Sequence, residues 1–223
     1  MKVLMYHNID HPPKTSEMKS LYVSPQKFQR QMQILRSMKF RVVEPNRFVE
    51  GKRSVMLTFD DGYKDFLEKA YPILKEMNLP AIVFVPAKLV GSYNVWDSYK
   101  LGVKKYLMDW EELSFLVKEG IKIGSHTLTH PFLTRISPSE ARREIEASKK
   151  LLEDKLGIPI DAFCYPYGDY NQEIKKMVAE AGYRYAYTTV EGDWRREDDP
   201  LEIKRIYVSG YWTSLRFLLK ILI

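Results

Sequence analysis

Eight short runs of apolar and β-branched residues recur along the chain, and patterns of helical spacing separate most of them. The runs lie at 2–7, 41–44, 55–60, 81–86, 121–126, 161–166, 183–189 and 203–208. Several are almost continuously apolar, as expected of parallel strands that are covered on both faces. Alternation of this kind favours a parallel α/β fold. Within 223 residues it suits a compact barrel, and a doubly wound open sheet is the alternative.

The helical patterns have recognisable ends. Ser24 before Pro25 predicts a helix start, and Ser137 with Glu140 predicts a capping box on a helix that Gly157 ends. Further helices are expected at 63–77, 109–120, 171–181 and 212–223. The irregular stretch 87–108, which holds Tyr93, Trp96 and Tyr99, is expected to be an insertion over one rim. Its aromatic side chains are expected to pack rather than bind a ligand.

The totals limit the class of protein. A chain of 223 residues can bury a large core, and we expect one domain, 1–223. The single cysteine, Cys164, excludes an internal disulfide and a cysteine-cluster metal site. The start "MKVLMYHNID" lacks the features of a signal peptide, and no apolar run approaches the ~20 residues of a spanning helix. A cytoplasmic location is therefore the default expectation. The net charge of +6 favours anionic partners only mildly, and the dispersed Lys and Arg residues argue against nucleic acid.

Polar residues follow several of the predicted strands. His7 ends the first run, Asp60 and Asp61 end the third, and His126 ends the fifth, with His130 four residues later. The carboxyl ends of parallel strands meet at one rim, so these side chains are expected to converge. Two imidazoles and a carboxylate can bind a metal and leave positions open for water and substrate. The alternatives are surface histidines in a capping loop, and an Asp-Gly turn or helix cap for the two acids.

Three motifs, "TFDDGY", "SHTLTH" and "YPYG", occur in an order that resembles the polysaccharide deacetylases, the NodB-homology group of carbohydrate esterases (family 4). The early "VLMYHNI" resembles the subgroup of poly-N-acetylglucosamine deacetylases. The resemblance implies a distorted (β/α)7 barrel and a hydrolytic site with a divalent metal. That metal is usually zinc, with Co²⁺, Ni²⁺ or Fe²⁺ as alternatives.

The resemblance also implies a role for each motif residue. Asp61, His126 and His130 would bind the metal, and Asp60 would be the base that deprotonates metal-bound water. That water would attack the amide carbonyl. His7 would be the acid that protonates the leaving amine.

Three further positions complete this comparison. The backbone N–H of Tyr167 would help to hold the oxyanion. The family's third motif begins with an Arg that pairs with the base, but this chain has Cys164 there, so Asp60 needs another partner and Arg205 is the candidate. Asp193–Trp194 is a candidate for the fourth motif.

The function expected from these residues is removal of N-acetyl groups from an amino sugar in a polysaccharide or glycan precursor. One alternative is a catalytically impaired glycan-binding module on the same fold. Another is a deacylase of a lipid-linked sugar, because the final "SLRFLLKILI" could lie on a membrane surface. A terminal helix packed on the barrel is the simpler interpretation of that segment.

Overall fold

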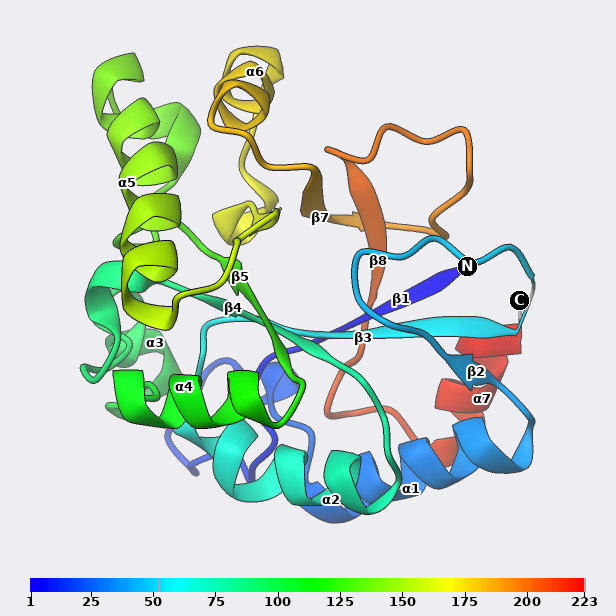
Figure 1. Ribbon diagram of the computed structural model, residues 1–223. Helices are drawn as coiled ribbons and strands as arrows, with labels where there is room; N and C mark the ends of the chain where they lie inside the picture. The colour runs from blue at the N-terminus through cyan, green and yellow to red at the C-terminus, as the bar shows by residue number, and fades with distance from the viewer. Residues whose placement is uncertain (52, 223) are drawn as a thin grey trace.

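The computed structural model describes residues 1–51 and 53–222, and its centre is a closed ring of parallel strands (Figure 1). The strands are β1 (Lys2–Tyr6), β2 (Arg41–Val42), β3 (Ser54–Phe59), β4 (Ile82–Val85), β5 (Lys122–Ser125), β6 (Ala162–Cys164), β7 (Tyr185–Glu191) and β8 (Ile203–Tyr207). Their order is β1-β8-β7-β6-β5-β4-β3-β2, and β1 also pairs with β3. Seven strands therefore close a barrel, and β2 lies outside it on β3. The predicted barrel is confirmed, and the open sheet is wrong.

Helices surround the barrel and begin and end close to the predicted positions (Figure 1). They are α1 (Pro25–Ser37), α2 (Tyr71–Glu76), α3 (Ser98–Leu101), α4 (Trp110–Lys118), α5 (Pro138–Leu156), α6 (Gln172–Glu180) and α7 (Ser214–Leu222), with a π-helical turn, Phe66–Ala70, leading into α2. The side chain of Ser24 caps α1, and the capping box of Ser137 and Glu140 on α5 is confirmed. Gly157 ends α5 with a left-handed φ of 66°.

Alternate residues of each strand pack into two different cores, as the twofold period of a strand requires. One set contacts the surrounding helices, and in β1 Leu4 belongs to it. The other set fills the barrel interior and comprises Val3, Met56, Ile82, Phe84, Ala162, Cys164, Tyr187 and Ile203. Gly124 of β5 makes room for this interior, since a Cβ there would lie 2.5 Å from the ring of Phe84.

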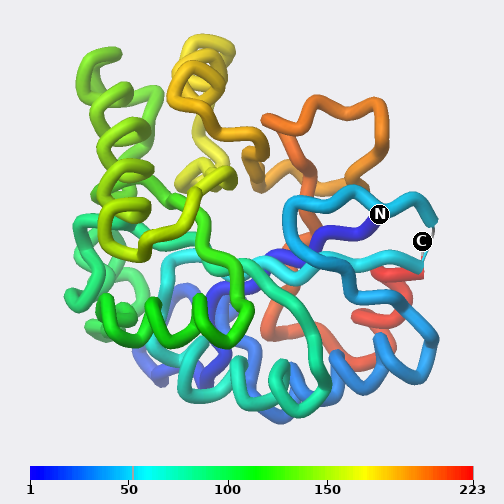
Figure 2. The backbone as a smooth tube through the Cα atoms, in the orientation of Figure 1, coloured from blue at the N-terminus to red at the C-terminus, as the bar shows by residue number. Residues whose placement is uncertain are grey.

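The segment 87–108 packs over one rim of the barrel, as expected (Figure 2). It is fastened to the residues that follow β3, because Met108 N–H donates to the carbonyl of Gly62 and Lys64 N–H donates to the carbonyl of Tyr106. Both hydrogen bonds measure 3.0 Å. The segment is therefore bound directly beside the two acids at the end of β3.

In the described part of the chain, the structure contains no helix with the length and apolarity that crossing a bilayer requires.

Candidate active site

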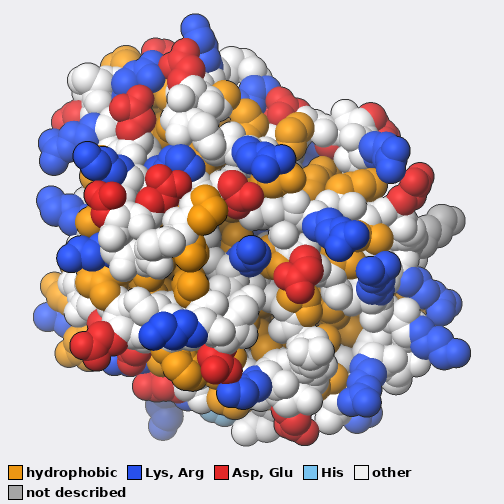
Figure 3. All heavy atoms as spheres, in the orientation of Figure 1, with side chains coloured by type: hydrophobic (Ala, Val, Ile, Leu, Met, Phe, Trp, Pro, Cys, Tyr) orange, Lys and Arg blue, Asp and Glu red, His pale blue; other side chains and the backbone are white. Residues whose placement is uncertain are grey.

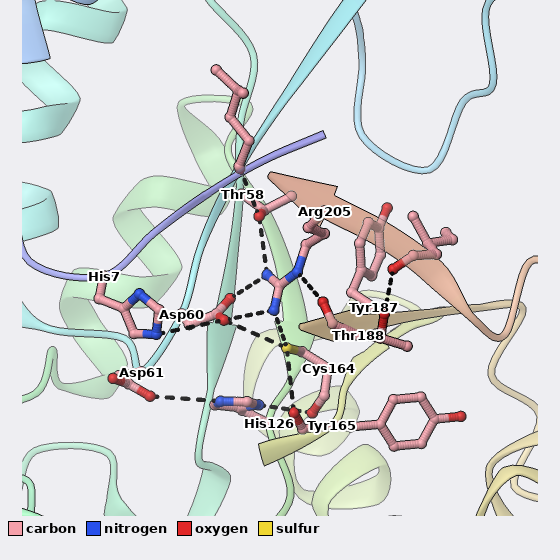
Figure 4. Close-up of polar contacts among 12 residues, drawn as sticks. His7, Thr58, Asp60, Asp61, His126, Cys164, Tyr165, Tyr187, Thr188 and Arg205 are labelled. Atoms are coloured by element: carbon pink, nitrogen blue, oxygen red, sulfur yellow. Dashed lines mark hydrogen bonds and ion pairs between the residues drawn. The ribbon is translucent and has the colours of Figure 1, made fainter. Parts of the chain in front are cut away.

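The end of β3 directs Asp60 into the mouth of the barrel. Asp60 continues the inward-facing series that begins with Met56, because it lies an even number of residues further along. Its backbone N–H donates to the carbonyl of Tyr6 at 2.9 Å, which ties the ends of β3 and β1 together. His7 follows β1 directly, and its Nε2 lies 4.0 Å from Oδ2 of Asp60. Two residues of the predicted site that are far apart in the sequence thus meet at the barrel mouth (Figure 4).

Asp61, His126 and His130 form a buried triad next to Asp60. The Oδ1 atom of Asp61 lies 3.5 Å from Nε2 of His126 and 3.3 Å from Nε2 of His130. The three side chains are almost inaccessible to solvent, and each offers a ligand atom within 4.8 Å of the others. The structure therefore brings together the three residues that the sequence assigned to a metal.

Backbone strain is concentrated at this site. Asp61, Thr127, His130 and Tyr167 all have left-handed φ values, between 60° and 74°. Non-glycine residues rarely adopt this conformation, and it costs on the order of 1–3 kcal/mol each. Such strain persists where the surrounding structure fixes side chains in a required direction. Three of these four residues belong to the predicted site.

Arg205 on β8 is the cation that pairs with Asp60, in place of the motif Arg that Cys164 replaces. Its guanidinium forms two parallel hydrogen bonds with Asp60, Nη1 to Oδ1 at 2.7 Å and Nη2 to Oδ2 at 2.8 Å (Figure 4). Nε donates to the carbonyl of Thr188, Nη1 also donates to Oγ1 of Thr58, and Nη2 lies 3.1 Å from the sulfur of Cys164. The predicted pairing of Asp60 with Arg205 is confirmed.

This pair determines the charge of Asp60. Burial alone would raise the pKa of the Asp60 carboxyl. The positive charge and hydrogen bonds of Arg205 outweigh burial and hold that pKa below its usual value. Asp60 is therefore ionised at neutral pH, with one side of its carboxylate held by Arg205 and the other facing His7.

The triad has the chemistry of a divalent metal site. Burial would raise the pKa of Asp61, but its hydrogen bonds with the two histidines lower it, so the carboxylate is charged. Burial lowers the pKa of His130, which favours the neutral ring that a metal ligand must have. Nδ1 of His126 bonds to the carbonyl of Cys164 at 2.7 Å, leaving Nε2 directed at Asp61. Two imidazole nitrogens and one carboxylate oxygen fit a catalytic metal with open positions.

A second buried group, formed by Asp60, His126 and Cys164, has ligand atoms equally close together. It is the poorer metal site, because the guanidinium of Arg205 already occupies both oxygens of Asp60. A cation placed there would be repelled by that guanidinium.

Tyr167 lies next to the triad, on the 3₁₀ turn Pro166–Gly168 that follows β6. Its ring stacks on Phe132 at a centroid distance of 3.8 Å and meets His130 edge-on at 4.6 Å. The six residues that the motifs assign to catalysis, metal binding and the oxyanion thus occupy one rim.

The sequence did not assign a site role to several residues that the structure brings here. Trp96 stacks on His130, with ring centroids 4.5 Å apart and planes inclined by 19°. Its neighbour Asp97 is buried, and burial together with the charge of Asp61 raises the pKa of Asp97 to about 7. The only signal was the density of aromatic residues in the segment 87–108.

Glu144 on α5 is a second residue of this kind. Its carboxylate accepts hydrogen bonds from the backbone N–H groups of Leu128 and Thr129 and from the hydroxyl of Thr129, at 2.7 to 2.9 Å. It therefore holds the loop that carries both histidines. No local pattern distinguished it from the other acids of α5.

Asp193–Trp194 is not at the site, and its assignment to the fourth motif is wrong. Trp194 exchanges two backbone hydrogen bonds with Met1, and Asp193 pairs with Lys2 at 2.8 Å. These contacts lie at the beginning of β1, whereas His7 lies past its other end.

Comparison with known proteins agrees with this geometry. A family model described as polysaccharide deacetylase matches residues 49–186. The chain belongs to this family. The resemblance seen in the motifs is thus confirmed, and this polysaccharide deacetylase keeps the two acids and both histidines of the motifs inside or next to its closed barrel.

Similar proteins cover most of this deacetylase. YxkH of Bacillus subtilis (strain 168) is 29% identical over 217 residues, which are 94% of this chain and 71% of YxkH. The poly-beta-1,6-N-acetyl-D-glucosamine N-deacetylase of Staphylococcus epidermidis is 28% identical over 206 residues, 88% of this chain and 71% of that protein. The Streptococcus pyogenes deacetylase PplD, solved in complex with acetate, is 27% identical, with a TM-score of 0.85 and coverage of 99% and 97% of the two chains.

Proposed function

We propose that this deacetylase removes N-acetyl groups from a polymer of N-acetylglucosamine type and that it needs a divalent metal, most simply Zn²⁺. One observation supports this most strongly: the triad of Asp61, His126 and His130 lies beside an ionised Asp60 that His7 approaches to 4.0 Å. The substrate class is supported by the Staphylococcus epidermidis relative, a poly-beta-1,6-N-acetyl-D-glucosamine N-deacetylase. We also propose that residues 1–223 act as one domain, since strands from residue 2 to residue 207 build a single barrel.

Each residue has a task in this proposal. A divalent metal held by Asp61, His126 and His130 would supply a water that is acidic enough to react at neutral pH and would polarise the amide carbonyl. Asp60 accepts the proton that this water loses as its oxygen bonds to the carbonyl carbon. Arg205 keeps Asp60 charged and fixes the direction of its free lone pairs.

His7 acts when the amide bond breaks. The imidazolium of His7 donates a proton to the amide nitrogen, so the sugar leaves as an amine and the acyl group as acetate. The backbone N–H of Tyr167 donates to the carbonyl oxygen while that oxygen carries negative charge. Nε2 of His7 lies 4.0 Å from Oδ2 of Asp60, so the proton that Asp60 gains can pass to His7 and restore both groups for the next turnover.

The test combines a metal measurement with an acetate assay. Purified protein should contain about one divalent ion per chain and release acetate from N-acetylglucosamine oligomers. Asp61→Asn should lose the metal. Asp60→Asn should keep the metal and lose turnover by on the order of 10²–10⁴-fold. Full activity in Asp60→Asn would refute its assignment as the base.

The impaired glycan-binding module makes a different prediction from the same protein. It would bind the oligomers without releasing acetate at any metal concentration. The ionised Asp60 and the confirmed Arg205 partner favour the enzyme, because the altered third motif has not left the base unpaired.

The lipid-linked sugar remains a second candidate because of α7. This helix packs Phe217 and Ile221 into the core but exposes Leu215, Leu219 and Leu222. On the face seen in Figure 3, Lys and Arg side chains are mixed with Asp and Glu. We propose that α7 can rest on a membrane surface.

Sedimentation with anionic vesicles tests whether α7 binds a membrane surface. Leu219→Lys should weaken vesicle binding, and equal binding by wild type and variant would contradict the proposal.

A further inference from the structure

The two histidines of the triad are held in different ways. The ring of His126 is fixed by a hydrogen bond, from its Nδ1 to the carbonyl of Cys164 at 2.7 Å. In His130 the backbone is fixed, because its N–H donates to Oγ1 of Thr127 at 2.9 Å. Its ring nitrogen Nδ1, however, is buried and has no hydrogen-bond partner among the described residues. A metal-binding histidine normally uses this second nitrogen to fix its ring.

Aromatic rings take the place of that hydrogen bond. Trp96 lies parallel to the imidazole of His130 at 4.5 Å, so it covers one face of the ring. The rings of Tyr167 and His126 meet the same imidazole edge-on, at 4.6 and 4.7 Å. A ring packed between one stacked and two perpendicular neighbours cannot rotate about its Cβ–Cγ bond without clashing with them.

Trp96 belongs to the segment 87–108. Backbone hydrogen bonds fasten this segment to Gly62 and Lys64, which follow Asp60 and Asp61 in the sequence. It also makes isolated bridges from Tyr63 to Leu107 and from Tyr93 to Tyr106. The residues after β3, which include Asp61, and the segment that carries Trp96 are therefore hydrogen-bonded to each other. His130 comes from a different loop, the one that follows β5.

We propose that Trp96 is a positioning residue, which keeps the imidazole of His130 directed at the metal by stacking on its face. This inference rests on the proposed function, because it assumes that the triad binds a divalent metal. It assigns the segment 87–108 a role in completing the metal site rather than only covering the rim.

Zinc affinity, measured on purified protein by competition with a chelator, is the first test. Trp96→Ala should raise the Zn²⁺ dissociation constant by about 10–100-fold, the usual effect of losing the group that orients a ligand. Trp96→Phe keeps a flat ring in contact with His130, so its dissociation constant should stay close to that of wild type. Tyr99→Ala is the matched control, since Tyr99 lies on the same segment and is exposed, and it should leave the affinity unchanged.

A spectroscopic measurement separates ring contact from general loosening. Co²⁺ or Ni²⁺ bound to His130 should quench the fluorescence of the stacked Trp96 more than that of the other three tryptophans. Trp96→Phe should therefore lose most of the metal-dependent quenching, while Trp194→Phe should retain it.

The outcomes distinguish the two proposals. If the wild-type protein binds no divalent metal, the proposed function fails. If wild type binds Zn²⁺ and Trp96→Ala binds it equally well, the proposed function stands and the role of Trp96 is overturned. Equal weakening in Trp96→Phe and Trp96→Ala would also overturn it, because the stacked ring would then not be the cause.

Discussion

At the scale of single residues, the contact between Arg205 and Asp60 decides whether the base works. Arg205 is completely buried, and its charge is matched by one carboxylate. Removing one partner of a buried pair leaves the other charge without compensation. The same contact makes β8 part of the catalytic site, because Arg205 is the cation that pairs with Asp60.

Replacing Arg205 with Met should destabilise the protein by about 3–5 kcal/mol and reduce kcat/KM by on the order of 10²-fold. Without the guanidinium, burial raises the pKa of Asp60, so the acid limb of the pH–rate profile should move to higher pH. Denaturant unfolding and a pH series of acetate release measure these effects. Arg142→Met, on an exposed pair with Glu146 and Glu180, should change stability by no more than about 0.5 kcal/mol.

The sign of the pH effect on stability follows from the same pair. In the folded wild type the pKa of Asp60 is lowered, below the ~3.9 of an unfolded chain. The contribution of the pair is therefore complete above about pH 4 and is lost as the pH falls through the folded-state pKa.

An exchange of two side chains provides a further test of this arrangement. Cys164 and Arg205 both contact Asp60 from inside the barrel mouth, with the sulfur 3.7 Å from Oδ2. The double variant Cys164→Arg/Arg205→Cys should recover part of the activity that Arg205→Met loses. If the double variant is folded by circular dichroism but no more active than Arg205→Met, an Arg on β6 cannot replace the one on β8 in this barrel.

At the scale of elements, the segment 87–108 brings a buried carboxyl group close to the charged Asp61. Asp97 lies on this segment, where burial and the negative charge of Asp61 raise its pKa to about 7. Its carboxylate accepts a hydrogen bond from Asn94 at 2.8 Å. In metal-free protein, ionisation of Asp97 therefore opposes the folded state.

Asp97→Asn should stabilise metal-free protein at pH 8, by on the order of 1 kcal/mol, and have little effect at pH 4. The folded state binds a proton on Asp97 more tightly than the unfolded chain does, so wild-type stability falls as the pH rises from about 4 to about 7. Urea unfolding at both pH values measures the difference. An equal effect of the substitution at pH 4 and pH 8 would contradict this account.

The elements also show what could be predicted from the sequence. Strands and capped helices such as the one beginning at Ser137 follow from local spacing and capping residues, so their positions were predictable. Trp96 and Glu144 act on a loop that is distant in sequence, and nothing local marks such contacts. Asp193–Trp194 matched a motif by its letters, but the connection between β7 and β8 carries it to Met1. Arg205 was predictable because Asp60 required a cation.

At the scale of the whole molecule, closure of the barrel depends on β1, which pairs with β3 on one side and β8 on the other. Leu4 in this strand is completely buried against the helices. Leu4→Ala should lower the free energy of unfolding by about 2–5 kcal/mol, because it leaves a cavity in a packed core. Denaturant unfolding gives the value, and Val95→Ala, at an exposed position, should change stability by less than about 0.5 kcal/mol. A small effect at Leu4 would show that β1 adds little to closure.

The pairing of β1 with β8 has a consequence for where the acid can come from. In sequence, His7 lies near one end of the chain and Arg205 near the other, yet in the ring their strands are neighbours. A ring has no first position, so a histidine supplied just after the final strand would reach almost the same place as one supplied after the first. For the same reason, a circular permutant that joins residue 222 to residue 1 through a linker and opens the chain elsewhere should keep His7 beside Asp60.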